Sequence, residues 1–181
     1  RILNNLADCE FHMALYQEAK GHIEESLNLY GALKNIQDIW IIQAKRLYGN
    51  ILFALGEKQK AFETVSIALS SAKQVLDAEH LELIRLNSCL GDYSDVEKAK
   101  RYYKEAIELA LETRNILALE RFELCRDGTR QFIAYTSENG TQFRYVVHRD
   151  MIDLPKVKDK DNFTRVIEYS LEENRRSSSN D

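Results

Sequence analysis

A pattern of small residues that returns three times restricts the fold of this chain more than any other feature. Its fixed point is an alanine, at Ala19, Ala61 and Ala99, so the spacings are 42 and then 38 residues. Thirteen positions before each alanine stands a large residue followed by a small or polar one: Leu6-Ala7, Tyr48-Gly49 and Leu86-Asn87. A second shared set follows each alanine, with a large residue, a small residue and then an aliphatic one: Ile23, Ser26, Leu27; Val65, Ala68, Leu69; Tyr103, Ala106, Ile107. Such self-similarity is typical of repeat architectures, in which each unit buries its apolar face against its neighbours.

Apolar residues around these alanines recur at helical spacing, which predicts amphipathic helices. In the second repeat the two predicted apolar faces are Ile39, Ile42, Leu47, Ile51 and Leu55, then Phe62, Val65, Ile67, Leu69 and Val75. One proline and seven glycines in 181 residues favour long helices with short connections. We therefore expect six helices in three pairs. Ser94 with Glu97 predicts a capping box, and Asn35 and Asp77 are predicted N-caps.

The three segments resemble the tetratricopeptide repeat, a helix-turn-helix unit whose small residues let its two helices pack closely. The resemblance spans residues 1–114 and rests on "LADCEFHMALYQEAKGHIEESL", "YGNILFALGEKQKAFETVSIAL" and "LNSCLGDYSDVEKAKRYYKEAI". Ala14, Gly56 and Ser94 fall at the turn of the unit, and Tyr16 matches the aromatic residue that follows it, whereas Lys58 departs from that pattern. The long spacing is similar to that of the longer-helix repeats of kinesin light chains and bacterial peptide-sensing regulators. The resemblance implies a mainly α fold, an antiparallel helix-pair solenoid.

In such repeats the first helix of each pair lines a concave surface, so the resemblance implies a partner-binding groove there. Polar residues three or four apart share one face of a helix. The candidate partner-binding residues are Asn4, Asn5 and Asp8 in the first repeat, Gln43, Arg46 and Asn50 in the second, and Arg85 and Ser88 in the third. We expect Arg46, Asn50 and Arg85 to hold a carboxylate or phosphate of a peptide through charge-assisted hydrogen bonds. The alternative for each residue is a solvated side chain on a helix face.

Two features qualify this groove. The arginine and asparagine side chains resemble part of the carboxylate clamp of chaperone-binding tetratricopeptide domains, but Leu81 and Ile84 stand where that clamp is polar. This departure argues against binding of chaperone tails. Trp40, Tyr48 and Tyr30 are either aromatic anchors of the groove or, as is commoner at helical spacing, residues that pack between helices.

Composition excludes several classes of protein. A net charge of −4 without a dense Lys/Arg cluster argues against direct nucleic-acid binding. No apolar stretch reaches the roughly 18 residues that a membrane span needs, so no membrane partner is predicted. Cys9, Cys89 and Cys125 are predicted to be buried reduced thiols, which suggests a cytoplasmic protein, with the nucleus as the alternative. Because the chain begins with Arg1, we expect a piece of a longer polypeptide.

Motifs of catalysis and metal binding are missing from the sequence. It has neither a phosphate-binding glycine loop nor HExxH nor GxSxG. His148-Arg149-Asp150 spells the tripeptide of the kinase catalytic loop, but Pro155 stands where a magnesium-binding asparagine is needed. His12, His22 and His80 have no second ligand at a metal-like spacing. We expect no enzyme activity, no cofactor and no metal.

The periodicity changes after the repeats. "QFIAYT" and "TQFRYVVH" alternate like strands, and "SENG" between them predicts a turn. We expect a β-hairpin or three-stranded meander over 115–150 that packs on the last repeat, a linker and short helix over 151–174, and a disordered tail over 175–181. The hairpin is predicted to be a cap, a strand-accepting edge or the start of a further domain.

Together these features predict a non-catalytic protein–protein interaction module of a larger protein, which binds a partner peptide or helix in its concave groove. The alternative is a peptide-sensing regulatory domain that controls an attached enzymatic or DNA-binding domain. The flanking sequence would distinguish the two.

Overall fold

The computed structural model describes residues 1–33, 38–113, 122–127, 130–136, 142–147 and 158–159. The chain divides into two compact units, Arg1–Ala106 and Ile107–Asp181, and each is described by itself. The described residues form six helices in the first unit and the start of the second, and four strands in the second. The described part of the chain is therefore mainly helical.

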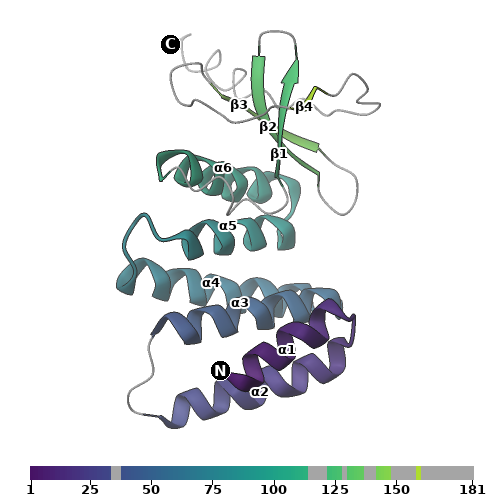
Figure 1. Ribbon diagram of the computed structural model, residues 1–181, viewed down its shortest axis with the longest axis vertical. Helices are drawn as coiled ribbons and strands as arrows, with labels where there is room; N and C mark the ends of the chain where they lie inside the picture. The colour runs from purple at the N-terminus through teal and green to yellow at the C-terminus, as the bar shows by residue number, and fades with distance from the viewer. Residues whose placement is uncertain (34–37, 114–121, 128–129, 137–141, 148–157, 160–181) are drawn as a thin grey trace. The chain divides into compact units, whose positions relative to one another are not determined.

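The helices follow one another as packed pairs. They are α1 (Ile2–His12), α2 (Tyr16–Ala32), α3 (Asp38–Ala54), α4 (Lys58–Val75), α5 (Leu81–Tyr93) and α6 (Val96–Glu112). Helix α1 packs on α2 and α3 on α4, and each of these pairs also contacts the next helix along the chain. Figure 1 shows the pair α1–α2, the pair α3–α4 and then α5 stacked one after another. The predicted succession of packed helix pairs is confirmed for the described residues.

Two of the turns within pairs are built alike, at the positions that the sequence predicts. Ala14 has φ 60° and Gly56 has φ 82°, the left-handed conformation that commonly ends a helix. The N–H that follows each of them reaches back to the helix, from Leu15 to Glu10 O (2.9 Å) and from Glu57 to Leu52 O (2.8 Å). These bonds satisfy carbonyl groups that a helix end would otherwise leave without a partner. They also reverse the chain within three residues.

The predicted helix caps are wrong in two places. Ser94 ends α5, and Asp95 instead caps α6 by accepting a hydrogen bond from the Lys98 N–H (3.0 Å). That bond lowers the pKa of the Asp95 carboxyl. Helix α5 is capped by the ring of His80, which accepts from the Glu82 N–H (3.1 Å), and not by Asp77. Asn35 lies outside the described residues.

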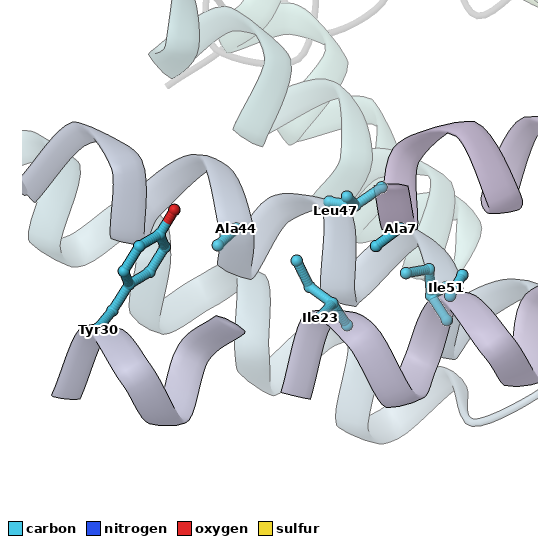
Figure 2. Close-up of a cluster of buried hydrophobic side chains, with 7 residues drawn as sticks. Ala7, Ile23, Tyr30, Ala44, Leu47 and Ile51 are labelled. Atoms are coloured by element: carbon cyan, nitrogen blue, oxygen red, sulfur yellow. The ribbon is translucent and has the colours of Figure 1, made fainter. Parts of the chain in front are cut away.

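The small residues of the repeat are the contact points of the helices. Ala19, Ala61 and Ala99 are all buried. Figure 2 shows the core between the first two pairs, where Ile23 and Tyr30 of α2 meet residues of α3. The buried members of this core are Ala7, Ala19, Ile23, Tyr30, Ala44, Leu47 and Ile51. The pattern by which the repeat is recognised in the sequence is thus the pattern of helix packing.

Two glycines mark the closest approaches of helices. A Cβ at Gly49 of α3 would overlap Cγ2 of Val65 on α4. A Cβ at Gly91 of α5 would overlap the ring of Tyr103 on α6. The backbones of these helix pairs are therefore nearer to each other than any larger residue would permit.

Charged side chains tie neighbouring elements together. Glu57, in the turn between α3 and α4, accepts hydrogen bonds from Lys20 of α2 (2.7 Å) and from Lys60 (2.5 Å). These bonds, with Lys20 the larger influence, lower the pKa of Glu57 to about 2. His22 of α2 lies 2.7 Å from Glu10 of α1.

Three side chains differ from the predicted burial. Ile67 and Val75, which belong to the predicted apolar face of α4, are exposed by about half. Cys9, predicted to be buried, is exposed, whereas Cys89 is buried as predicted. The side chain of Cys125 is outside the described part of the chain.

The second unit contains strands β1 (Phe122–Asp127), β2 (Arg130–Thr136), β3 (Gln142–Val147) and β4 (Lys158–Asp159). Their order in the sheet is β3-β2-β1-β4, with β2 antiparallel to both neighbours and β4 parallel to β1. The predicted turn at Asn139-Gly140 and the tail over 175–181 fall outside the described residues, as does most of the predicted linker and helix over 151–174. A hairpin that packs on the last repeat stays a prediction.

Candidate functional site

The candidate residues lie on the first helices of the three pairs. Helix α3 contacts both α1 and α5, so these three helices form one continuous side of the first unit. Asn5 and Gln43 are exposed on this side, and Asp8 is exposed with its carboxylate 3.7 Å from the ring of His12. We call the side formed by α1, α3 and α5 the first-helix face.

Two of the predicted arginines meet on the first-helix face at a carboxylate that the prediction did not include. Arg46 of α3 donates through Nε to Oε1 of Glu82 on α5, at 2.5 Å. Nη1 of Arg85, one turn further along α5, lies 3.8 Å from the other carboxylate oxygen. Glu82 has no exposed side-chain surface, whereas 23% of Arg46 and 32% of Arg85 is exposed. Two guanidinium groups from neighbouring helix pairs therefore lie beside one buried carboxylate.

The position of Glu82 follows from the repeat. When the alanines are aligned, Glu82 falls on Ala44 of α3, which is buried in the core between the first two pairs. A charged residue at a buried position needs partners, because the loss of water around a lone carboxylate is costly. A charge at a core position of the aligned repeats is the sequence signal that identifies Glu82.

Asn50 forms a second link between α3 and α5. Its Oδ1 accepts hydrogen bonds from the Tyr93 hydroxyl (2.5 Å) and from the Cys89 thiol (3.3 Å). Tyr93 also stacks on Phe53, with 4.8 Å between the ring centres. Burial, and after it the neighbouring Cys89, raises the pKa of Tyr93 well above its ordinary value. The amide oxygen of Asn50 is thus held by the fold.

Two more candidates are engaged within the first unit. Asn4 accepts a hydrogen bond from Ser26 of α2 through its Oδ1 (2.6 Å), and this bond joins the two helices of the first pair. Ser88 donates to the Ile84 carbonyl of its own helix (3.0 Å). The structure therefore brings Arg46 and Arg85 together and places Asn50 in the adjacent link. Asn5 and Asp8 lie on α1, in a different helix pair.

The three aromatic residues considered as groove anchors take part in packing. Tyr30 is buried, and Trp40 packs against the core with the Arg1 guanidinium 5.2 Å from its ring centre. Tyr48 donates to Glu24 of α2 (2.7 Å), and burial, followed by this bond, raises the pKa of its hydroxyl. Packing between helices, the commoner interpretation of these aromatics, is confirmed for Tyr30 and Tyr48.

Other kinds of site were sought in the described residues. They contain no group of three or more His, Cys, Asp or Glu side chains that could hold a metal ion. None of the helices described is both long enough and apolar enough to cross a membrane. A small polar hollow of about 240 Å³ lies where the start of α4 meets the α5–α6 turn, with Lys58, Phe62, Tyr93 and Lys98 among its walls.

Comparison with known proteins assigns no family: no family model, no curated protein and no solved structure matches the chain. The resemblance to tetratricopeptide repeats therefore rests on the residues of the sequence. The packing of successive helix pairs is compatible with it.

Proposed function

We propose that this chain is a non-catalytic protein-binding module, a tetratricopeptide-like solenoid whose first-helix face binds a partner helix or extended peptide. One observation carries the proposal. Arg46 and Arg85 come from neighbouring helix pairs, converge on Glu82, and retain exposed surface on that face. Because these side chains come from two repeats and meet at one place, both can contact a ligand that runs across the repeats.

The chemistry of the cluster indicates the kind of partner. Arginine presents several N–H donors in a planar group and binds carboxylates well, even when one donor is already used. The exposed parts of the two guanidinium groups favour an acidic side chain of the partner over a basic one. Exposed Gln43, on the same face of α3, adds an amide that can bond to a peptide backbone.

The wider setting belongs to the same proposal. We place the module in a larger cytoplasmic protein. The alternative, a peptide-sensing regulatory domain, would use the same face and differ in its attached domain. Nothing in the described ranges favours that alternative over the interaction module.

The first experiment locates the binding face. A photo-crosslinking amino acid placed at Gln43, on the first-helix face, should capture a partner that can then be identified by mass spectrometry. The same amino acid at Gln59, which is exposed on α4, is the matched control. Equal capture at both positions, or capture at Gln59 alone, would place binding elsewhere and contradict the proposal.

The second experiment tests the arginines with the captured partner. Arg85→Ala should weaken binding by about 10-fold or more, since a hydrogen bond to a charged group is worth about 1.5–3 kcal/mol. Arg46→Gln is made together with Glu82→Gln, because removal of Arg46 alone would leave a buried carboxylate without its main donor. Lys60→Ala, which removes an exposed cation from α4, is the control and should leave Kd unchanged. A partner that binds all of these variants equally well would rule out the cluster as its site.

A further inference from the structure

Helix α1 carries an apolar stripe that is open to solvent. Ile2 is 84% exposed, Leu6 41% and Met13 69%, and Cys9 is exposed between them. The spacings of four and three residues place Ile2, Leu6 and Cys9 on one face of α1, and Met13 is the residue directly after the helix. We call these four residues the α1 stripe. It is separate from the Arg46–Glu82–Arg85 cluster.

The repeat shows what the equivalent face does elsewhere in the molecule. Alignment on Ala19, Ala61 and Ala99 pairs the α1 stripe with two sets of residues. They are Ala44, Tyr48 and Ile51 in α3 with Leu55 directly after it, and Glu82, Leu86, Cys89 and Tyr93 in α5. In α3 the equivalents are buried or partly buried, and in α5 all four are buried. The face that is open in α1 is thus covered in both of the other first helices.

The cover in both cases is the preceding helix pair. Ala44 and Ile51 of α3 lie in one core with Ile23 and Tyr30 of α2, as Figure 2 shows. Tyr48 of α3 donates its hydroxyl to Glu24 of α2. The α5 face is covered in the same way, because Glu82 contacts Arg46 of α3, and Cys89 and Tyr93 donate to Asn50 of α3. Each stripe is therefore half of an interface between successive pairs.

We propose that the α1 stripe is the seat of a further helix pair of the same repeat, joined in tandem ahead of α1. The existing interfaces between pairs define its geometry. Five residues separate α2 from α3 (33–37) and α4 from α5 (76–80), so the second helix of the added pair ends about five residues before α1. The exposed face of α1 carries this inference, which stands or falls independently of the proposed peptide groove.

The α3–α4 pair of the same chain can be used to test whether a helix pair binds to the α1 stripe. Helix α4 covers α5, and the alignment places Arg1 on Leu81, so residues 38–80 fused directly to Arg1 bring a copy of α4 to α1 in the native register. In the added copy Arg46 is changed to Leu, because its native partner Glu82 is replaced at that position by Ile2. The complete chain, residues 1–181, follows unchanged.

The readout is the alkylation rate of Cys9, measured by mass spectrometry of its own peptide, together with helicity measured by circular dichroism. We expect Cys9 to react at least tenfold more slowly in the fused chain than in the original chain, and the added segment to be helical. Cys9 that reacts equally fast, or an added segment without helicity, would overturn the proposal.

Two matched substitutions separate this seat from a general change in stability. Leu6→Glu should restore fast alkylation and lower Tm in the fused chain, yet leave the Tm of the original chain unchanged. Leu29→Glu, at a residue of α2 that is 51% exposed, should change neither the alkylation rate of Cys9 nor the Tm. If the original chain instead forms dimers in sedimentation and Leu6→Glu abolishes them, the stripe belongs to a second copy of the chain and the tandem proposal is wrong.

Discussion

The close approach of α3 to α4 can be tested by adding a single methyl group at Gly49. The new Cβ would overlap Cγ2 of Val65 and would also lie 3.5 Å from the Ala61 carbonyl oxygen and from Cε2 of Tyr93. Val65 is fully buried and β-branched, so its side chain is confined to few rotamers and has little room to move aside. The methyl group therefore has to push the two helices apart.

Two opposing contributions set the size of the effect. Alanine is favoured over glycine inside a helix by about 1 kcal/mol. Overpacking of a well-packed core costs about 1–3 kcal/mol, and overlap with a buried branched side chain belongs in the upper part of that range. We expect Gly49→Ala to lower the free energy of unfolding by about 1–2 kcal/mol.

Gly21 provides the matched control for the same chemical change. It lies inside α2, is exposed, and an added Cβ there would meet nothing within 4 Å. Only the helix-propensity contribution applies, so Gly21→Ala should raise the free energy of unfolding by about 0.5–1 kcal/mol. The two substitutions are thus predicted to have opposite signs.

Urea unfolding monitored by circular dichroism measures both variants. Val65→Ala, combined with Gly49→Ala, removes the overlapping methyl group, so the double variant should be more stable than the sum of the two single changes predicts. A Gly49→Ala protein as stable as Gly21→Ala, or additive behaviour with Val65→Ala, would show that the helices are not in close contact at this point.

Three further predictions concern the polar links. Arg46→Ala should cost about 2–4 kcal/mol in urea unfolding because it strands a buried carboxylate, while the pair Arg46→Met with Glu82→Met should recover most of that loss; equal losses would contradict the ion pair. Glu57 has a pKa of about 2 in the folded protein against an ordinary 4.5, so its stabilising contribution is present above pH 4.5 and is lost as the pH falls towards 2. Glu57→Gln should therefore flatten the fall of Tm over that interval, and an unchanged slope would refute this assignment. Asn50→Ala removes the acceptor of the Tyr93 hydroxyl and should cost about 1–3 kcal/mol, with faster hydrogen exchange in α5; unaltered exchange there would argue against the link.

The helix pairs could be predicted from the sequence because the constraint that forms them is local and steric. A helix can approach its partner closely only where its side chains are small. The residue types at Ala19, Gly49 and Ala61 therefore indicate where helices pack closely. Gly56 likewise indicates the turn, because glycine readily adopts the positive φ of 82° found there. Repetition of these positions makes the signal stronger than that of any single helix.

Periodicity was less reliable for the exact buried face. Ile67 follows Val65 by two residues, about 200° around a helix, and therefore points away from the core that Val65 occupies. Its apolar character suggested burial, but its phase on the helix did not. The predicted N-cap of α6 was wrong by one residue for a related reason. Ser94 and Asp95 are both good cap residues, and only the position at which α5 ends decides between them.

The candidate site was harder to predict because its chemistry depends on a contact between pairs. Arg46 and Arg85 are 39 positions apart in the sequence. Taken alone, neither can be distinguished by its position from a solvated charge on a helix face. Glu82 changes the surroundings of both arginines, because its buried carboxylate accepts a hydrogen bond from Arg46 at 2.5 Å and lies near Arg85. Two arginines without a carboxylate beside them would favour a doubly charged group such as phosphate, whereas Glu82 offsets part of their charge inside the protein. Under the proposed function we therefore expect a single carboxylate of a partner to be preferred. Glu82→Gln removes this negative charge and should shift preference towards phosphorylated peptides. A Kd ratio between phosphorylated and glutamate-containing peptides that does not change would show that Glu82 has no part in selecting the partner.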